Sequence, residues 1–259
     1  MRHPGGEGGP SVADRVFVVL ESCAGSSQAL TLVDLVERTG LPKTTLHRMC
    51  WKLVELGMLE HADNGFRIGT KLFALGSMNP GLRRLRAMAM PHLHALVERT
   101  GWAVNLAVLA DDRALIVEEI YGAQSQTMRR MVGGRLPLHA TAVGKALLSG
   151  YSGARLDAVL GMTALRPYTR TTIVRPNLLR EQLDAVRRTG AAFSHEEWSV
   201  GTSGVASPVT VAGRVVAAVA AVGPPGDQGL RQRANSVRHT ALVVSRALSP
   251  APAPAAVAA

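Results

Sequence analysis

The sequence contains few cysteines, and this shortage narrows the class of protein. Only two occur among 259 residues, Cys23 and Cys50. Both fall within helical patterns, without a CxxC pair or a Cys/His cluster at metal-ligand spacing, which excludes a disulfide framework and a cysteine metal site. We interpret them as small core residues of a reduced, cytosolic protein. No metal and no cofactor is expected.

Long apolar runs are also lacking. The longest, residues 215–222, is far shorter than the roughly 18 residues of a membrane-spanning helix, so no membrane span is predicted. The first ten residues, MRHPGGEGGP, lack the apolar region of a signal peptide and are predicted to be a disordered arm. The tail at 249–259 is of low complexity and is predicted to be disordered too. The remaining composition, 47% hydrophobic and 19% charged, is that of a globular protein.

Acidic residues are fewer than basic ones, 19 against 29, which gives a formal net charge of +10. Such an excess suggests a polyanionic partner, most commonly nucleic acid, although an arginine-rich surface exposed to solvent explains it equally well. Residues 1–80 carry eight basic and eight acidic side chains, so the whole excess lies in 81–259. Within the neutral part, Arg38, Lys43, Arg48 and Lys52 occur between positions 38 and 52 with no acidic residue among them.

The first 69 residues have the order of a winged helix-turn-helix. Helical apolar spacing predicts helices at 12–23, at 32–39 after Thr31 as N-cap, and from Pro42 to about 56, with Gly40 ending the second helix. Two short strands, 58–61 and 65–68, follow around an expected turn at Asn64-Gly65. Three helices and a hairpin can also be an ordinary small fold, but this order is typical of winged helix-turn-helix domains.

The third helix leaves polar donors on the faces opposite its apolar stripe. In LPKTTLHRMCWKL, the arginine suits a guanine edge, the threonines suit phosphates or a thymine methyl, and the remaining basic residues suit backbone or base contacts. A helix face exposed to solvent is the plain alternative for any basic helix, and the winged-helix order outweighs it. The residues expected to bind DNA are Arg38, Lys43, Thr44, Thr45, His47, Arg48, Lys52, Asn64 and Arg67.

The rest of the chain predicts linker helices followed by an α+β domain. Helical patterns at 70–78 and 82–99 are separated by Asn79-Pro80-Gly81. Beyond them, short apolar runs predict strands at 103–110, 114–120, 126–132, 204–211 and 215–222. Helices are expected at 140–149, 154–160, 178–189 and 230–248, so an antiparallel sheet would be covered by helices on at least one face.

Four segments together resemble the IclR-type transcriptional regulators. They are GLPKTTLHRM at 40–49, GFRIGTKLFALGS at 65–77, RLPLHATAVGKALLS at 135–149 and HEEWSVGTSGVASPV at 195–209. Their order and spacing agree with the family over roughly 12–248. The resemblance implies a winged helix-turn-helix domain (11–69), linker helices (70–99) and a GAF/PAS-like α/β effector-binding domain (100–248). It also implies operator DNA and a small-molecule effector as partners, and a homodimer or a dimer of dimers.

The resemblance also places an effector pocket. By motif, its residues here would be Ala142, Val143, His195, Glu196, Gly204, Ala220 and Val222, and Met128 is added from the strand expected before the HATAVGKA segment. This chain departs from members that bind small acids, because family members often have a cysteine at the position of Gly204 and serines at those of Ala220 and Val222. Fewer donors remain to satisfy a buried carboxylate. We therefore expect a larger, apolar or aromatic effector rather than a two- or three-carbon keto acid.

The leading interpretation is a cytoplasmic, ligand-responsive DNA-binding regulator without catalytic activity. Effector binding would alter operator affinity through the 70–99 linker. One alternative is an enzyme acting on its small molecule in 100–248, with the helical N-terminus as an oligomerisation module. It would need a nucleophile or an acid/base pair, and the sequence offers neither clearly. Another is a non-specific nucleic-acid binder driven by the positive charge of the second part.

Overall fold

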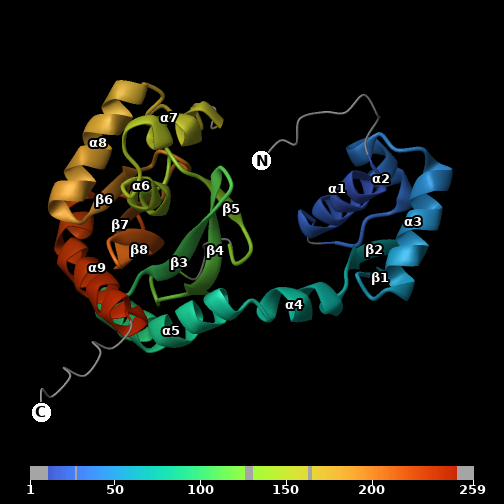
Figure 1. The fold of residues 1–259 in the computed structure, drawn as a ribbon, viewed down its shortest axis with the longest axis horizontal. Helices are drawn as coiled ribbons and strands as arrows, with labels where there is room; N and C mark the ends of the chain where they lie inside the picture. Colours follow the sequence, from blue (N-terminus) through green and yellow to red (C-terminus); the bar gives the residue numbers. More distant parts are fainter. Residues whose placement is uncertain (1–10, 27, 126–130, 163–164, 250–259) are drawn as a thin grey trace, which may run out of the picture. The chain divides into compact units, whose positions relative to one another are not determined.

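The computed structural model describes residues 11–26, 28–125, 131–162 and 165–249, and the chain divides into two compact units, 1–83 and 84–259 (Figure 1). The arm predicted at 1–10, nearly all of the tail predicted from 249 and most of the strand predicted at 126–132 lie outside the described residues. No helix in the described ranges is long and apolar enough to cross a membrane.

Three helices open the first unit: α1 (Val12–Ala24), α2 (Leu32–Thr39) and α3 (Lys43–Glu55). Thr31 caps α2 as expected, and its hydroxyl accepts the Asp34 N–H while the Asp34 carboxylate accepts the Thr31 N–H. Gly40 ends α2 with φ of 67°, a left-handed conformation that glycine adopts without steric cost. Pro42 is the residue before α3 rather than its first helical residue.

A two-stranded hairpin follows, formed by β1 (Leu59–Ala62) and β2 (Gly65–Ile68). Its turn residues are Asp63 and Asn64, both with positive φ, so the expected Asn64-Gly65 turn is wrong by one position. Gly65 is instead the first residue of β2. A Cβ at Gly65 would lie 2.7 Å from the Leu30 carbonyl oxygen, because the chain before α2 crosses here and pairs with Phe66. Glycine therefore permits this close approach.

The core of the first unit lies between the three helices and the hairpin. The stripe predicted on α3 supplies Leu46, Cys50 and Leu53 as buried residues, with Met49 and Val54 half-buried beside them. Both cysteines are buried and free. The helix thus turns its remaining side chains outward.

Two helices continue the chain, α4 (Thr70–Ser77) in the first unit and α5 (Pro80–Thr100), which runs into the second. Pro91 lies inside α5. No side chain of α4 is buried, whereas Leu85, Ala89, Leu93 and Leu96 give α5 a buried stripe in the second unit.

In the described part of the second unit, six strands form one antiparallel sheet in the order β5-β4-β3-β8-β7-β6. The strands are β3 (Ala103–Ala110), β4 (Arg113–Ile120), β5 (Arg135–Pro137), β6 (Ala192–His195), β7 (Ser203–Val211) and β8 (Arg214–Gly223). Four of them lie where the apolar runs predicted. β5 and β6, the two short edge strands, were not predicted, because three or four residues carry too little periodicity.

Helices pack on this sheet, as the fold class predicts (Figure 1). They are α6 (Ala142–Leu148), α8 (Pro176–Thr189) and α9 (Asp227–Leu248), while α7 (Gly153–Met162) adds Leu156 and Val159 to the core beside α6 and α8. Alternate residues of β8 point to opposite faces, and Ala218 and Ala220 share a core with α6 and α8. Helix α9 packs along β7 and β8. The small side chains of β8 leave room on the α6 face.

Candidate DNA interface and ligand cavity

The outer face of α3 is the candidate DNA interface. Lys43, Thr44, His47 and Arg48 are exposed, and Thr45 is half-buried beside the core. Helical spacing places Thr44 and Arg48 one turn apart on the same side, away from the buried Leu46 and Cys50. The hairpin adds Asn64 at its turn and Arg67 on β2, both exposed.

Three of the basic residues expected to bind DNA already have partners within the unit. The Arg38 guanidinium donates to the Ser22 carbonyl oxygen at 3.4 Å and so ties α2 to α1. Lys52 forms an ion pair with Glu55 at 2.8 Å, one helical turn further on.

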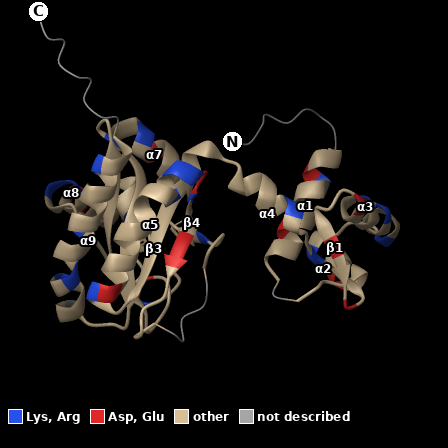
Figure 2. Ribbon diagram, turned by 90° about the horizontal axis from the view of Figure 1, so that it is seen from below, with Lys and Arg blue, Asp and Glu red and all other residues tan. Residues whose placement is uncertain are grey.

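The third, Arg67, pairs with Glu60 on the facing strand at 3.2 Å. Arg48 and Lys43 are exposed and take part in neither ion pair. Basic and acidic residues therefore occur together on α3 and the hairpin (Figure 2). The stretch without acidic residues ends at Lys52, which pairs with Glu55 three residues further on, and the hairpin brings Glu60 beside Arg67.

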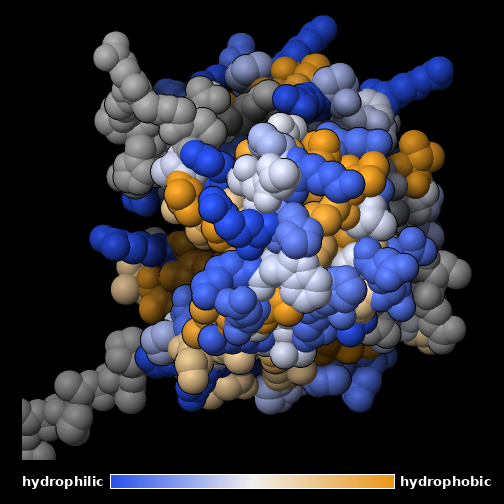
Figure 3. Space-filling view, turned by 90° about the vertical axis from the view of Figure 1, so that its right-hand side faces the viewer, coloured by the Kyte–Doolittle hydropathy of each residue, from blue (hydrophilic) through white to orange (hydrophobic). Residues whose placement is uncertain are grey.

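Trp51 is a residue of this surface that the sequence reasoning missed. Its indole is 41% exposed and stacks on His61 of β1, with 5.1 Å between ring centroids. It also contacts Phe66 edge-on at 5.9 Å, which joins α3 to the hairpin. In Figure 3, which faces the side where Figure 1 places α3, hydrophilic side chains surround smaller apolar areas. The sequence could have indicated Trp51, because it is a single tryptophan on the polar side of a predicted helix.

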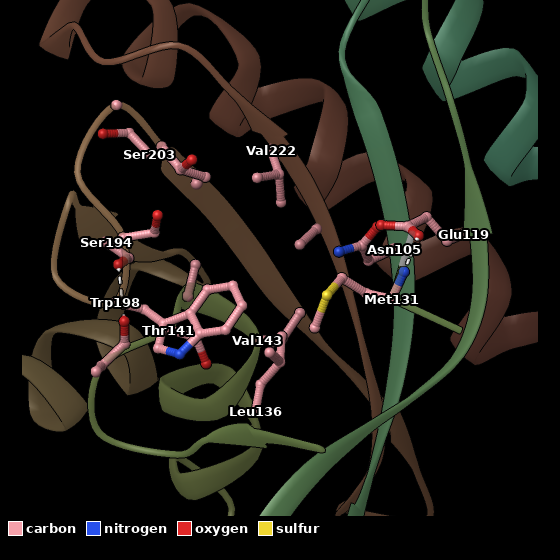
Figure 4. A pocket seen from close by; sticks show the side chains of 17 residues that line it. Asn105, Glu119, Met131, Leu136, Thr141, Val143, Ser194, Trp198, Ser203 and Val222 are labelled. Carbon is pink, nitrogen blue, oxygen red and sulfur yellow. Dashed lines mark hydrogen bonds between the residues drawn. The ribbon is translucent and has the colours of Figure 1, made fainter. Parts of the chain in front are cut away.

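The second unit contains a cavity of about 600 Å³ between the sheet and the segment that follows β6 (Figure 4). This volume suits a small organic molecule. Strands β3, β4, β7 and β8 form its floor, and the start of α6 and the loop between β6 and β7 form its walls. Its lining residues are Asn105, Glu119, Met131, Leu136, Ala140, Thr141, Ala142, Val143, Ser194, Trp198, Ser199, Gly201, Thr202, Ser203, Gly204, Ala220 and Val222.

Five of the eight residues predicted for the pocket line this cavity: Ala142, Val143, Gly204, Ala220 and Val222. Met128 lies outside the described residues.

His195 and Glu196, which were also predicted for the pocket, do not line this cavity. Successive residues of β6 point to opposite faces, so Ser194 faces the cavity and His195 is exposed on the other side. The Glu196 carboxylate instead accepts the Gly201 N–H at 2.6 Å and closes the loop.

A buried ion pair holds this loop. Lys145 of α6 and Glu197 are joined at 2.6 Å, with side chains 0% and 4% exposed. The Lys145 ammonium also donates to Gln182 Oε1 at 2.6 Å and to the Phe193 carbonyl oxygen at 3.0 Å, so all three donors are used. Thr172 donates to the Glu197 carbonyl oxygen at 2.6 Å. Trp198, the next residue, is thereby placed as a wall of the cavity.

Burial shifts the protonation of two groups behind the cavity. It lowers the pKa of Lys145, and the neighbouring Glu197 carboxylate opposes that shift. Burial also lowers the pKa of His139, whose Nε2 lies 3.0 Å from the Arg166 carbonyl oxygen. The neutral imidazole is favoured there.

The end of the cavity formed by β3 and β4 also carries polar side chains. Asn105 of β3 lies directly across from Glu119 of β4, and Glu119 Oε2 accepts the Met131 N–H at 2.7 Å. Little in the amino-acid sequence indicates this pair, because a polar residue inside an apolar strand is visible but its partner depends on strand register. Among the described residues, no group of three His, Cys, Asp or Glu side chains could hold a metal ion.

Comparison with known families and proteins gives consistent matches for both units. The model of the IclR helix-turn-helix domain matches residues 12–63, and that of the bacterial transcriptional regulator IclR C-terminal domain matches 82–248. The acetate operon repressor of Salmonella typhimurium is 34% identical over 197 residues, covering 74% of this chain and 72% of that protein. Transcriptional repressor IclR of Escherichia coli is 33% identical over 191 residues, 72% of this chain and 70% of its own length.

Solved structures agree. An IclR homolog from Microbacterium hydrocarbonoxydans, complexed with 4-hydroxybenzoate, has a TM-score of 0.82 and 29% identity, covering 92% of this chain and 99% of that one. Thermotoga maritima IclR has a TM-score of 0.71 and 25% identity, covering 91% and 98%. The similarity therefore extends over both units of the chain.

Proposed function

Because this chain belongs to the IclR family of bacterial transcriptional regulators, we propose that α3 reads operator DNA and that a small molecule in the cavity controls this binding. The chain is a DNA-binding transcriptional regulator of the IclR type. The finer assignments are residues 11–69 as the DNA-binding domain, 70–99 as the linker and 100–248 as the effector-binding domain. The protein would act in the cytoplasm, where bacterial DNA lies. The names of the two relatives support repression, rather than activation, of transcription.

Arg48 is the observation that carries the DNA proposal. It is exposed on the side of α3 away from the core, in the first half of the helix, and takes part in neither ion pair seen among the described residues of the unit. An arginine there can donate two hydrogen bonds to a guanine edge. Lys43, Thr44, Thr45 and His47 lie around it. Lys52 and Arg67 would contact phosphates, where Glu55 and Glu60 weaken their field.

A titration of the chain's own upstream DNA tests this assignment. Arg48→Ala should lose on the order of 1–3 kcal/mol of specific binding and relax one base position. Lys52→Ala should weaken binding less, equally on all sequences. Arg188→Ala, an exposed arginine of α8, is the matched control and should bind as wild type does. Equal binding by Arg48→Ala and wild type would refute α3 as the recognition helix.

The control also separates a non-specific binder from a sequence-specific one. If the charge of 84–259 drove binding, Arg188→Ala would weaken it as much as Arg48→Ala does. The enzyme alternative gains no support, because the relatives named above are regulators. We propose that the chain binds its small molecule without converting it, which prolonged incubation with unchanged ligand would support.

The lining of the cavity supports an apolar or aromatic effector. Trp198, Met131 and Leu136 offer flat or flexible apolar contacts, and Gly204 and Ala220 leave space between them. A cavity of about 600 Å³ is much larger than a two- or three-carbon acid needs. The similar Microbacterium protein was solved with 4-hydroxybenzoate, a ring of the kind this lining suits.

Calorimetry distinguishes the two ligand classes. We expect 4-hydroxybenzoate to bind more tightly than pyruvate or glyoxylate. Gly204→Val should abolish binding of a ring, since a Cβ there meets Ala142 and Val222 at an ordinary 3.6 Å and its methyl groups would narrow the cavity between β7 and α6. Tight binding of a keto acid, lost in Gly204→Val, would refute the aromatic assignment.

We further propose a homodimer, able to pair into a dimer of dimers. Two copies of α3 on a twofold axis would meet two half-sites about one helical turn of DNA apart. Helix α4 exposes Phe73 and Leu75, and Met78 directly after the helix is exposed too; a second copy could cover these apolar side chains. Sedimentation should give a dimer or tetramer that Phe73→Ser weakens, and a monomer at micromolar concentration would refute the proposal.

A further inference from the structure

We propose that Asn105 and Glu119 select an effector that carries a hydrogen-bond donor, such as a ring hydroxyl or amine, at the end held by β3 and β4. This inference rests on the proposed effector-binding function of the cavity and adds the orientation and chemical class of the ligand. Asn105 would be the residue that touches the donor, and Glu119 the residue that positions Asn105.

The two side chains form a cross-strand pair in the floor of the cavity. Asn105 lies opposite Glu119 on one side and opposite Ala220 of β8 on the other. Its side chain lines the cavity although the residue is only 5% exposed. Buried amides of this kind are almost always hydrogen-bonded, so the orientation of Asn105 is constrained by its neighbours.

Glu119 is fixed by groups other than Asn105. Its Oε2 accepts the Met131 N–H at 2.7 Å and a short hydrogen bond from the Tyr121 hydroxyl. The other oxygen, Oε1, faces Asn105. An ionised carboxylate only accepts hydrogen bonds, so it requires a donor from the amide.

Hydrogen bonding therefore assigns the two ends of the Asn105 amide, which are alike in shape. With nitrogen beside the carboxylate, Nδ2 donates to Glu119 Oε1 at 3.1 Å and to the Val104 carbonyl oxygen at 3.3 Å. The opposite arrangement would put two acceptors face to face. Figure 4 draws the amide with its oxygen toward Glu119 and its nitrogen in the cavity, and exchanging these two ends gives the hydrogen bonds just described. The end in the cavity is thus the carbonyl oxygen, an acceptor.

The charge of Glu119 orients the rest of the ligand. A ligand carboxylate at this end would meet a fixed negative charge, which disfavours it in a buried site. On the far side of the cavity, the Ser203 hydroxyl can donate a hydrogen bond to a ligand, whereas the hydroxyls of Ser194 and Thr141 already donate to the Ala140 and Pro137 carbonyl oxygens (Figure 4). An aromatic acid would therefore place its acid group there and its ring donor at Asn105.

Three ring acids of similar size provide the test, measured by calorimetry on the full chain. 4-Hydroxybenzoate and 4-aminobenzoate carry a donor opposite the acid, whereas benzoate carries none. Wild type should bind the first two about tenfold or more tightly than benzoate, because benzoate leaves a buried acceptor unpaired. Asn105→Leu removes the acceptor and should bring all three affinities within about twofold of one another.

A second variant keeps the proposal testable if Asn105→Leu does not fold. Glu119→Gln can accept or donate, which frees Asn105 to turn either end into the cavity, so the preference for a donor should fall there too. Ser203→Ala, at the other end, is the matched control and should weaken all three acids alike. An unchanged preference in both Asn105→Leu and Glu119→Gln, or a wild type that prefers benzoate, would overturn the inference alone. Failure of all three acids to bind would overturn it together with the aromatic effector.

Discussion

The Lys145–Glu197 ion pair permits a quantitative prediction about stability. Both side chains are at most 4% exposed, and the ammonium makes three hydrogen bonds. Removing the charge of one partner leaves the other buried and uncompensated, which typically costs 3–5 kcal/mol. Glu197→Gln keeps an acceptor oxygen near Lys145, so we expect a loss near the lower end, about 3 kcal/mol.

Calorimetric melting of the full chain measures this loss. For a unit of this size, about 3 kcal/mol corresponds to a fall in Tm of roughly 6–12 °C in the transition of residues 84–259. Glu55→Gln is the matched control. The Lys52–Glu55 pair is a lysine–glutamate ion pair too, at 2.8 Å, but its side chains are 66% and 65% exposed. Exposed pairs contribute less than about 1 kcal/mol, so its transition should hardly move.

The pH dependence of Glu197→Gln adds an independent check. Burial lowers the pKa of Lys145, and the carboxylate that opposes this shift is gone in the variant. The unfolded chain then binds a proton that the folded variant releases, so the variant's stability should rise with pH below the ordinary lysine pKa of 10.5. Equal Tm shifts for Glu197→Gln and Glu55→Gln, with no recovery at high pH, would refute the reasoning.

Three further predictions concern other sites. Gly65→Ala should destabilise the first unit by about 1–3 kcal/mol in urea unfolding, since its Cβ would lie 2.7 Å from the Leu30 oxygen; an unchanged midpoint would contradict this close contact. Burial lowers the pKa of His139, so stability should decrease as the pH falls below 6.5, and His139→Gln should flatten that part of the profile. Burial raises the pKa of the Cys50 thiol to about 11, so native protein at pH 8 should resist alkylation there until denaturant is added.

The sequence predicted the DNA-binding unit well because its signals are local. Thr31 as a cap, Gly40 in a left-handed conformation and the α3 stripe each depend on neighbours within a few residues. The hairpin turn was misplaced because Gly65 resembles a turn glycine. In the fold, the absence of a Cβ at Gly65 instead permits close contact with Leu30, which is distant in sequence. The partners of Lys52 and Arg67 also required the fold.

The cavity was predicted only in part, because its lining also depends on contacts between residues that are distant in sequence. The motif resemblance pointed to Ala142, Gly204 and Val222, which line the cavity. It did not indicate which face of β6 is turned inward, and in the structure Ser194 rather than His195 points into the cavity. Asn105 and Glu119 lie in different strands, and only their register makes them a pair. The roles of such residues arise from strand pairing, which apolar periodicity does not specify.

Ligand-dependent binding to operator DNA tests the central claim most directly. Footprinting of the chain's own upstream region would be titrated with and without saturating 4-hydroxybenzoate, for wild type and for Gly204→Val. We predict that the ligand changes wild-type affinity by about fivefold or more, and that Gly204→Val binds DNA without responding. Wild-type DNA affinity that is unchanged while the ligand occupies the cavity, or an equal response in Gly204→Val, would contradict control through the cavity.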